Sequence, residues 1–253
     1  MTDTFVLTPD MLATGRFGVE MRAPTYGDLR KARRLFPFEK AERGERIGYV
    51  PDDLLLASLL VSINGQSLGH ANDLIERLNI LPLADRQALS AILMETFYLS
   101  KEQANVAASK ARAKRTDPYE YQDIPAADTP TGGLGVRFMV PTSKIQMVCE
   151  QRYQGLEKSG VGLEEYMFAY CLMHLNDVDV QGEKDKLSLL DGLEITDIQY
   201  ATNYFIALST IDEETRVDVK KYSAAIRQQL QKSPAAFTPV TAKAAPEDSI
   251  VAT

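Results

Sequence analysis

The spacing of apolar and polar residues predicts a strand pair at the start of the chain. Phe17, Val19 and Met21 alternate with polar or small neighbours over 17–23, which is typical of a strand with one face toward a core. Residues 4–8 predict a second short strand, and a turn-rich segment separates the two. Small β elements are therefore expected before the first helix.

A helix is predicted next, over about 26–36. Thr25 precedes it and Asp28 follows three residues later, a spacing that allows a capping box on the free amides of the first turn. The helix is strongly basic, and its cations are Arg30, Lys31, Arg33 and Arg34.

Leucine-rich periodicity predicts the central elements of the first half. Residues 54–63 form an apolar face too wide for a surface helix, and Asn64 and Gly65 are expected to end it in a turn. A short helical piece is predicted at about 70–79, and a longer helix from Asp85 to about Lys114.

The same pattern recurs 112 residues later. Residues 53–97 align with 165–209, and the matched pairs include Asn64 with Asn176, Asp73 with Asp185, Leu78 with Leu190, Asp85 with Asp197 and Gln87 with Gln199. The segment 18–25 likewise matches 135–142 in Gly, Val, Pro and Thr. An internal duplication follows, with second-half helices at 143–157, 164–175 and 196–210.

The predicted fold class is mainly α with small β elements (α+β), built from two similar strand–helix–helix–helix units. The first unit is placed at 1–115, a Pro/Gly-rich linker at 116–133 and the second unit at 134–232, including a final helix over 212–231. The tail, 233–253, lacks periodicity and is expected to be flexible. We expect the apolar helices to be the most buried elements, and the two units to pack about a pseudo-twofold.

Composition is that of an ordinary soluble globular protein. Among 253 residues, 45% are hydrophobic and 25% charged, with a net charge of −7. The acidic balance argues against a general nucleic-acid binder. No secretory signal is evident, and the longest apolar run, 54–63, is far shorter than the ~20 residues that a membrane span needs. Cys149 and Cys171 are not in a metal-binding spacing and are expected to be buried free thiols.

No catalytic, cofactor-binding or metal-binding residue is predicted. His70 and His174 are the only histidines and cannot supply the three or four ligands of a metal site. A nucleophilic pair of Cys171 with His174 lacks any marked oxyanion site. The glycine run at 131–136 precedes a strand, whereas a phosphate loop follows one, so it is interpreted as the end of the linker.

The basic residues remain as the candidate contact site. Arg30, Lys31, Arg33 and Arg34, together with the cations of 110–115, indicate either an anionic partner surface or a solvated helix face. The second unit's counterpart helix is far less basic. We therefore predict these four residues as a protein-contact surface of the first unit only.

Residues 5–98 resemble a known family. The strand and turn at 5–15, the segment MRAPTYGD at 21–28, the apolar helix at 52–65 and NILPLADRQALSAIL at 79–93 are similar to baseplate-hub and tail-assembly proteins of contractile-tailed, T-even-type bacteriophages. The Cys-x-x-Cys metal knuckle that family members often carry is replaced here by LSKEQANVA.

The resemblance implies a non-enzymatic protein that builds a phage tail baseplate or its hub. Its partners would be other tail or baseplate proteins, with no cofactor, small-molecule substrate or membrane, in the host cytoplasm during assembly or in the virion tail. Two alternatives stay open: a cytoplasmic helical adaptor unrelated to phages, and an enzyme or regulatory domain with a pocket between the units.

Overall fold

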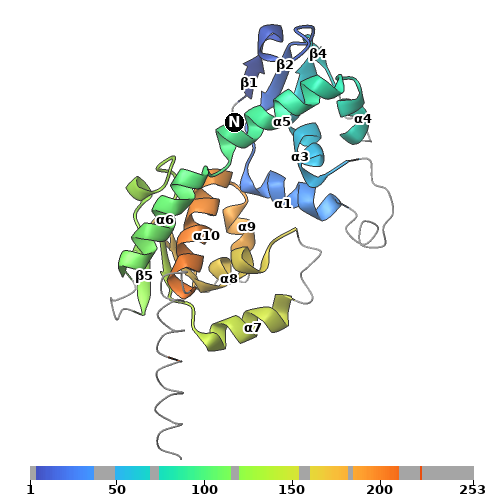
Figure 1. Cartoon of the computed structure of the whole chain (residues 1–253). Helices are drawn as coiled ribbons and strands as arrows, with labels where there is room; N and C mark the ends of the chain where they lie inside the picture. The colour runs from blue at the N-terminus through green and yellow to red at the C-terminus, as the bar shows by residue number, and fades with distance from the viewer. Residues whose placement is uncertain are drawn as a thin grey trace, which may run out of the picture. The chain divides into compact units, whose positions relative to one another are not determined.

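Two successive repeats with the same order of elements make up the described chain (Figure 1). The structure, a computed structural model, describes residues 4–36, 49–68, 74–114, 120–153, 160–181 and 185–210, with the single further position 223. The described residues up to Thr210 belong to one compact unit. The predicted helix at 212–231 and the tail at 233–253 lie outside this description.

The first repeat contains a four-stranded antiparallel sheet in the order β1-β2-β3-β4 and helices that follow its strands. Its elements are β1 (Thr4–Leu7), the short 3-10 helix η1 (Pro9–Met11), β2 (Val19–Arg22), α1 (Tyr26–Leu35), α3 (Pro51–Leu59), β3 (Leu60–Ile63), β4 (Gln66–Ser67), α4 (Leu74–Asn79) and α5 (Leu83–Phe97).

The second repeat has the same layout after an intervening helix, α6 (Lys101–Lys114). Its sheet has the order β5-β6-β7-β8. Its elements are β5 (Tyr121–Ile124), the 3-10 helix η2 (Ala126–Asp128), β6 (Val136–Met139), α7 (Ser143–Tyr153), α8 (Leu163–Cys171), β7 (Leu172–Leu175), β8 (Val178–Asp179), α9 (Lys186–Leu190) and α10 (Ile195–Ser209).

The two sheets agree in register as well as in order. Leu7 lies opposite Val19 in the first sheet, and Ile124 lies opposite Val136 in the second. Both central strand pairs carry an irregularity at the same relative position, after Glu20 in β2 and after Arg137 in β6. The predicted fold class, mainly α with small β elements in two similar units, is confirmed.

Each apolar helix is shorter than predicted, because its last residues form a strand. Residues 60–63 leave the helix and pair with β2, and residues 172–175 pair with β6. In both places the strand continues directly from the helix with no polar break in the sequence. A continuous apolar run therefore hid the change from helix to strand.

The linker prediction for 116–133 is wrong for the part that the structure describes. Residues 121–124 form the first strand of the second sheet, with Gln122 and Ile124 buried and their neighbours exposed. Pro125 follows the strand rather than interrupting it, so it does not remove a hydrogen bond from the strand pair. The second repeat therefore begins before residue 134.

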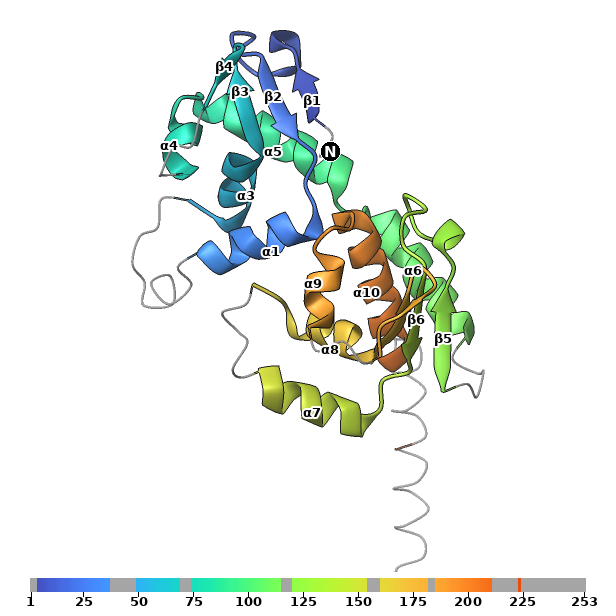
Figure 2. The same ribbon diagram turned by 180° about the vertical axis from the view of Figure 1, so that it is seen from behind.

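The long helix predicted from Asp85 to Lys114 is two helices. After α5 ends, Ser100 and Gln103 form a reciprocal cap, in which each side chain accepts a hydrogen bond from the other's backbone amide. The new helix, α6, packs along α10 of the second repeat, as both views show (Figures 1 and 2). The border predicted at 115 therefore places α6 with the wrong repeat.

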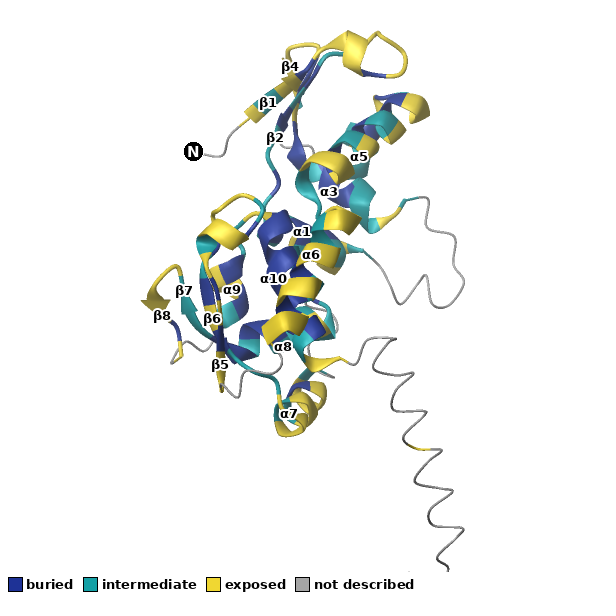
Figure 3. Ribbon diagram, turned by 60° about the vertical axis from the view of Figure 1, so that its left-hand side comes forward, coloured by how far each residue is buried: buried dark blue, intermediate teal, exposed yellow. Residues whose placement is uncertain are grey.

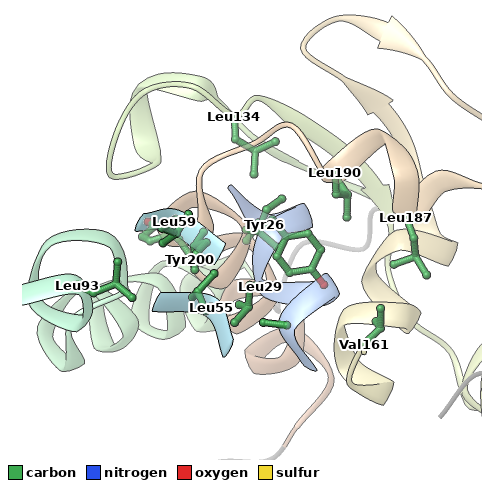
Figure 4. Packing of buried hydrophobic residues seen from close by; sticks show 14 of the residues in the cluster. Tyr26, Leu29, Leu55, Leu59, Leu93, Leu134, Val161, Leu187, Leu190 and Tyr200 are labelled. Carbon is green, nitrogen blue, oxygen red and sulfur yellow. The ribbon is translucent and has the colours of Figure 1, made fainter. Parts of the chain in front are cut away.

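Both α10 and α1 contribute to the hydrophobic core. Ten of the fifteen residues of α10 are buried, against five of nine in α3 and three of nine in α8 (Figure 3). The expectation of strongest burial is therefore wrong for 164–175, whereas in 54–63 eight of ten residues are buried. Tyr26 and Leu29 of α1 lie between leucines of the first repeat and the second-repeat residues Leu187 and Leu190 (Figure 4). One hydrophobic core thus joins the two repeats through α1.

Candidate protein-contact sites

The repeated asparagines hold the turn after each helix–strand pair. Asn64 and Asn176 have φ of 50° and 47°, a left-handed conformation that asparagine tolerates better than most residues. Their Oδ1 atoms accept hydrogen bonds from the amides of Gly18 at 2.8 Å and Gly135 at 2.7 Å. They were predicted as turn residues, which is confirmed, and each also ties its turn to the loop before the central strand.

The repeated aspartates connect a helix to a distant loop. Asp85 is fully buried and accepts hydrogen bonds from the amide and hydroxyl of Thr14 at 2.7 and 2.6 Å. Asp197 likewise accepts hydrogen bonds from the hydroxyl and the backbone amide of Thr131, and the amide nitrogen lies 3.0 Å from Oδ1 of Asp197. Both residues stand where the predicted helices begin, a position typical of a local cap, but their partners lie 71 and 66 residues away.

A sequence signal for this loop contact was present and missed. Residues 14–19 and 131–136 both spell T-G-x-x-G-V. Each motif supplies the threonine that binds the buried aspartate and the glycine amide that binds the turn asparagine. The glycine run at 131–136 is therefore a structural loop of the second repeat, and not the end of a linker.

Two of the four predicted contact residues are used inside the chain. Arg30 donates from Nη1 to Asp191 and, at 3.0 Å, to the carbonyl of Leu187. Arg33 donates to both carboxylate oxygens of Glu165 at 3.1 Å. These side chains join α1 to the second repeat, and a contact of Arg30 or Arg33 with another protein stays a prediction. The run of charges gave no indication that their partners lie more than 130 residues away.

Lys31 and Arg34 lie on the exposed side of the same helix. They are the part of the predicted contact surface that remains available to a partner, and their role stays a prediction. The predicted capping box at the start of α1 is confirmed, since Thr25 and Asp28 cap one another. The Asp28 carboxylate also accepts hydrogen bonds from both terminal nitrogens of Arg22, each at 2.7 Å.

Glycines permit the close approach of α1 to the second repeat. Gly160 has φ of +74°, and a side chain there would lie 2.2 Å from the carbonyl oxygen of Arg30. A side chain at Gly27 would lie 2.8 Å from Cβ of Asp191. The contact between the repeats is therefore backbone against backbone and tolerates no added methyl group.

Both cysteines are buried free thiols, as predicted. Burial raises the pKa of the Cys171 thiol to about 12, and burial also raises the pKa of Cys149. A thiol held protonated is a poor nucleophile. His174 lies on β7 across from Arg137, and His70 lies outside the described residues.

A groove of about 690 Å³ lies beside the β5–β6 hairpin. All of its lining residues belong to the second repeat, so it is not the pocket between units that the enzyme alternative required. Its polar groups are largely engaged with one another: Arg137 binds Asp123, and Asn176 binds Gly135 and Gly133. Within the described ranges, no three His, Cys, Asp or Glu side chains converge on a position for a metal ion.

The outer side of α5 differs sharply from its counterpart on α10. We call it the α5 face and define it by five exposed residues of one helix side, namely Leu83, Ala84, Gln87, Ala91 and Met94. The matching positions of α10 are all buried or half-buried, namely Ile195, Thr196, Gln199, Asn203 and Ile206. Leu83 is 61% exposed, whereas Ile195 is fully buried.

The α10 side is covered by α6 and the residues that lead into it. Thr196 Oγ1 donates to the carbonyl of Phe97 at 2.7 Å, and Gln199 Oε1 accepts from the amide of Leu99 at 2.8 Å. Ala107 and Ala111 of α6 are fully buried, and small side chains let two helices approach closely. Among the described residues, no helix covers the α5 face in the same way.

Comparison with protein-family models, curated proteins and solved structures finds no match for this chain. None of the helices in the described ranges combines the length and apolar character needed to cross a lipid bilayer.

Proposed function

We propose that this chain is a non-enzymatic assembly or structural protein of a contractile phage tail, acting through protein–protein contacts at the baseplate or its hub. The observation that carries the contact role is the α5 face, where Leu83 and Met94 are exposed although the same side of α10 is covered. An exposed apolar helix side with a buried counterpart in the same fold is a surface that a partner helix fits.

The distribution of polar groups supports a scaffold rather than a catalyst. The polar residues that recur in both repeats, Asn64 with Asn176 and Asp85 with Asp197, bind their own loops. Arg30 and Arg33 bind the second repeat. The side chains most suited to chemistry are thereby committed to holding the fold.

The phage assignment comes from the resemblance of residues 5–98, and the identity of the partner decides it. A helical adaptor unrelated to phages would present the same α5 face but bind different proteins. The products of the genes that flank the coding gene separate the two hypotheses, since tail-tube, sheath and tape-measure proteins are expected there for a tail-assembly protein.

The test is co-expression of the full chain with each flanking gene product, followed by affinity capture. We expect a tail or baseplate protein to be retained in a fixed ratio. Changing Lys31→Glu together with Arg34→Glu should weaken that capture if the exposed basic side of α1 contributes, because both cations are exposed. Lys144→Glu is the matched control, since Lys144 is an exposed lysine on α7, the second-repeat counterpart of α1.

Failure of every flanking tail protein to be retained would contradict the phage assignment. Equal capture by the wild type and the doubly reversed variant would show that the basic side of α1 is not the contact, and it would leave the α5 face as the surface to be examined.

A further inference from the structure

The contact between α6 and α10 provides a template for what covers the α5 face. Within the chain, the segment that follows α5 lies across α10 of the next repeat, with Leu99 donating to Gln199. Gln87 stands at the position of Gln199 on α5, and it is exposed. The segment equivalent to α6 for this side of α5 is the one that follows α10.

The residues after α10 continue the repeat in sequence. At the spacing of 112, Leu99 corresponds to Ile211 and Ser100, which caps α6, corresponds to Asp212, another residue type that favours helix caps. Within 211–232, apolar residues recur at helical spacing, namely Val219, Tyr222, Ile226 and Leu230. The sequence therefore predicts a second α6-type segment at 211–232.

Thr210, the last described residue before this segment, follows the end of α10 that is remote from the α5 face of the same chain (Figures 1 and 2). The Thr196–Phe97 hydrogen bond places the start of α10 at the end of α5. The two helices extend to opposite sides of this junction in both views (Figures 1 and 2). At about 1.5 Å per residue, each 15-residue helix spans roughly 20 Å. Ile211 lies two residues after Ser209, the last residue of α10, and two residues of extended chain cover only about 7 Å.

We propose that the α5 face binds the segment 211–232 of a second copy of this chain, in the manner in which α10 binds α6. Gln87 Oε1 accepts a hydrogen bond from the backbone amide of Ile211 of the other copy, as Gln199 Oε1 accepts one from the amide of Leu99. Ala84 and Ala91 allow the close approach that Ala107 and Ala111 allow in α6. Leu83 and Met94 supply the apolar contact. The inference rests on the proposed function in taking the α5 face as a protein-contact surface.

The contact made by α1 is not expected to recur between copies. Gly27 of α1 lies against Asp191 with no room for a side chain. The corresponding residue of α7 is Lys144, whose side chain would prevent α7 from making the same close contact with another copy. The association is therefore limited to the segment and the α5 face. Such a contact joins two different surfaces, so it propagates head to tail unless the copies close into a ring.

The test uses full-length chains and the oligomeric state. Sedimentation velocity of the purified wild type should show association that increases with protein concentration. Ala91→Arg introduces a charge into the centre of the α5 face, and Val219→Asp introduces one into the segment. Each should raise the dissociation constant at least about tenfold, because an unpaired charge is costly to bury. Both variants should keep the wild-type circular dichroism spectrum.

Mixing the two variants gives the decisive measurement. Ala91→Arg retains an intact segment and Val219→Asp retains an intact α5 face, so the mixture should form a one-to-one heterodimer and nothing larger. Met147→Arg, at an exposed residue of α7 away from α5, is the control and should associate like the wild type.

The inference would be overturned if the wild type stayed monomeric at a protein concentration of about 0.1 mM, which is well above a micromolar dissociation constant. That result is expected if the face binds its own chain or a different protein. Association that neither variant weakens, or a mixture that fails to pair, would overturn it equally. Because only purified chain is used, these results are independent of capture by tail proteins, which tests the proposed function.

Discussion

Removing the carboxylate of Asp85 should destabilise the first repeat by an amount that the structure allows us to estimate. Asp85 is fully buried and accepts two hydrogen bonds from Thr14. A hydrogen bond to a charged group contributes roughly 1.5–3 kcal/mol. Thr14 is itself exposed, so water can replace its lost partner and the lower end of this range applies. Asp85→Ala should therefore cost about 3 kcal/mol of unfolding free energy.

Equilibrium urea unfolding followed by circular dichroism measures this change. With an m-value near 3 kcal/mol per molar, typical at the upper end for small proteins, the midpoint should fall by about 1 M. Asp85→Asn keeps one acceptor and should lose about half as much. Asp197→Ala, which removes the equivalent contact with Thr131, should match Asp85→Ala to within about 1 kcal/mol.

The control is Glu95→Ala, at an exposed position of the same helix, which should change stability by less than about 0.5 kcal/mol. If Asp85→Ala lies within that margin of the control, the buried aspartate does not hold the loop and the reasoning fails. A large loss for Asp85→Ala with none for Asp197→Ala would refute the equivalence of the two repeats.

Three further changes test other features of the fold. Gly160→Ala should cost at least about 3 kcal/mol of unfolding free energy, because it adds a clash with a carbonyl of α1 to the penalty of a positive φ. Gly65 has open space around it at φ +75°, so Gly65→Ala should cost only about 1–2 kcal/mol in the same unfolding assay. Cys171, whose pKa burial raises to about 12, should resist maleimide at pH 8 in the folded protein and react in guanidinium, as read by mass spectrometry; labelling of native protein would contradict its burial. Burial acts to raise the pKa of Asp28, but hydrogen bonds from Arg22 and from Thr25 outweigh burial and lower that pKa. The ion pair of Arg22 with Asp28 therefore stabilises the fold fully above about pH 4, and this stabilisation is lost as the pH falls. The destabilisation by Arg22→Gln should accordingly be present at pH 7 and shrink towards pH 2, and a pH-independent difference would exclude this linkage.

Local signals in the sequence predicted the local structure well. The T-x-x-D spacing before α1 predicted the capping box, and the recurrence of Asn64 as Asn176 predicted two equivalent turns. The capping box is predictable because its two residues lie three positions apart, and the turns are predictable because asparagine tolerates a left-handed backbone. The order of the main helices in the two repeats was predicted from their own periodicity, whereas the strands at 60–63, 121–124 and 172–175 were not.

Contacts made over long distances were not predictable in this way. Arg30 lies in a run of cations that resembles a solvated face, and only the fold brings it to Asp191. The change from helix to strand at Leu60 occurs within the predominantly apolar segment 54–63, whose residue pattern marks no boundary there. Asp85 has the sequence position of a helix cap, but its partner comes from a loop 71 residues earlier.

The placement of α6 decides where the chain can be divided for experiment. Ala107 and Ala111 pack in the helix layer of the second repeat, although in the sequence they precede the predicted border at 115. An expression fragment that begins at the apparent border near 116 would expose the side of α10 that these alanines cover and would tend to aggregate. A fragment that begins before Leu99 carries its own cover, and it is the one to choose for isotope labelling or crystallisation of that half.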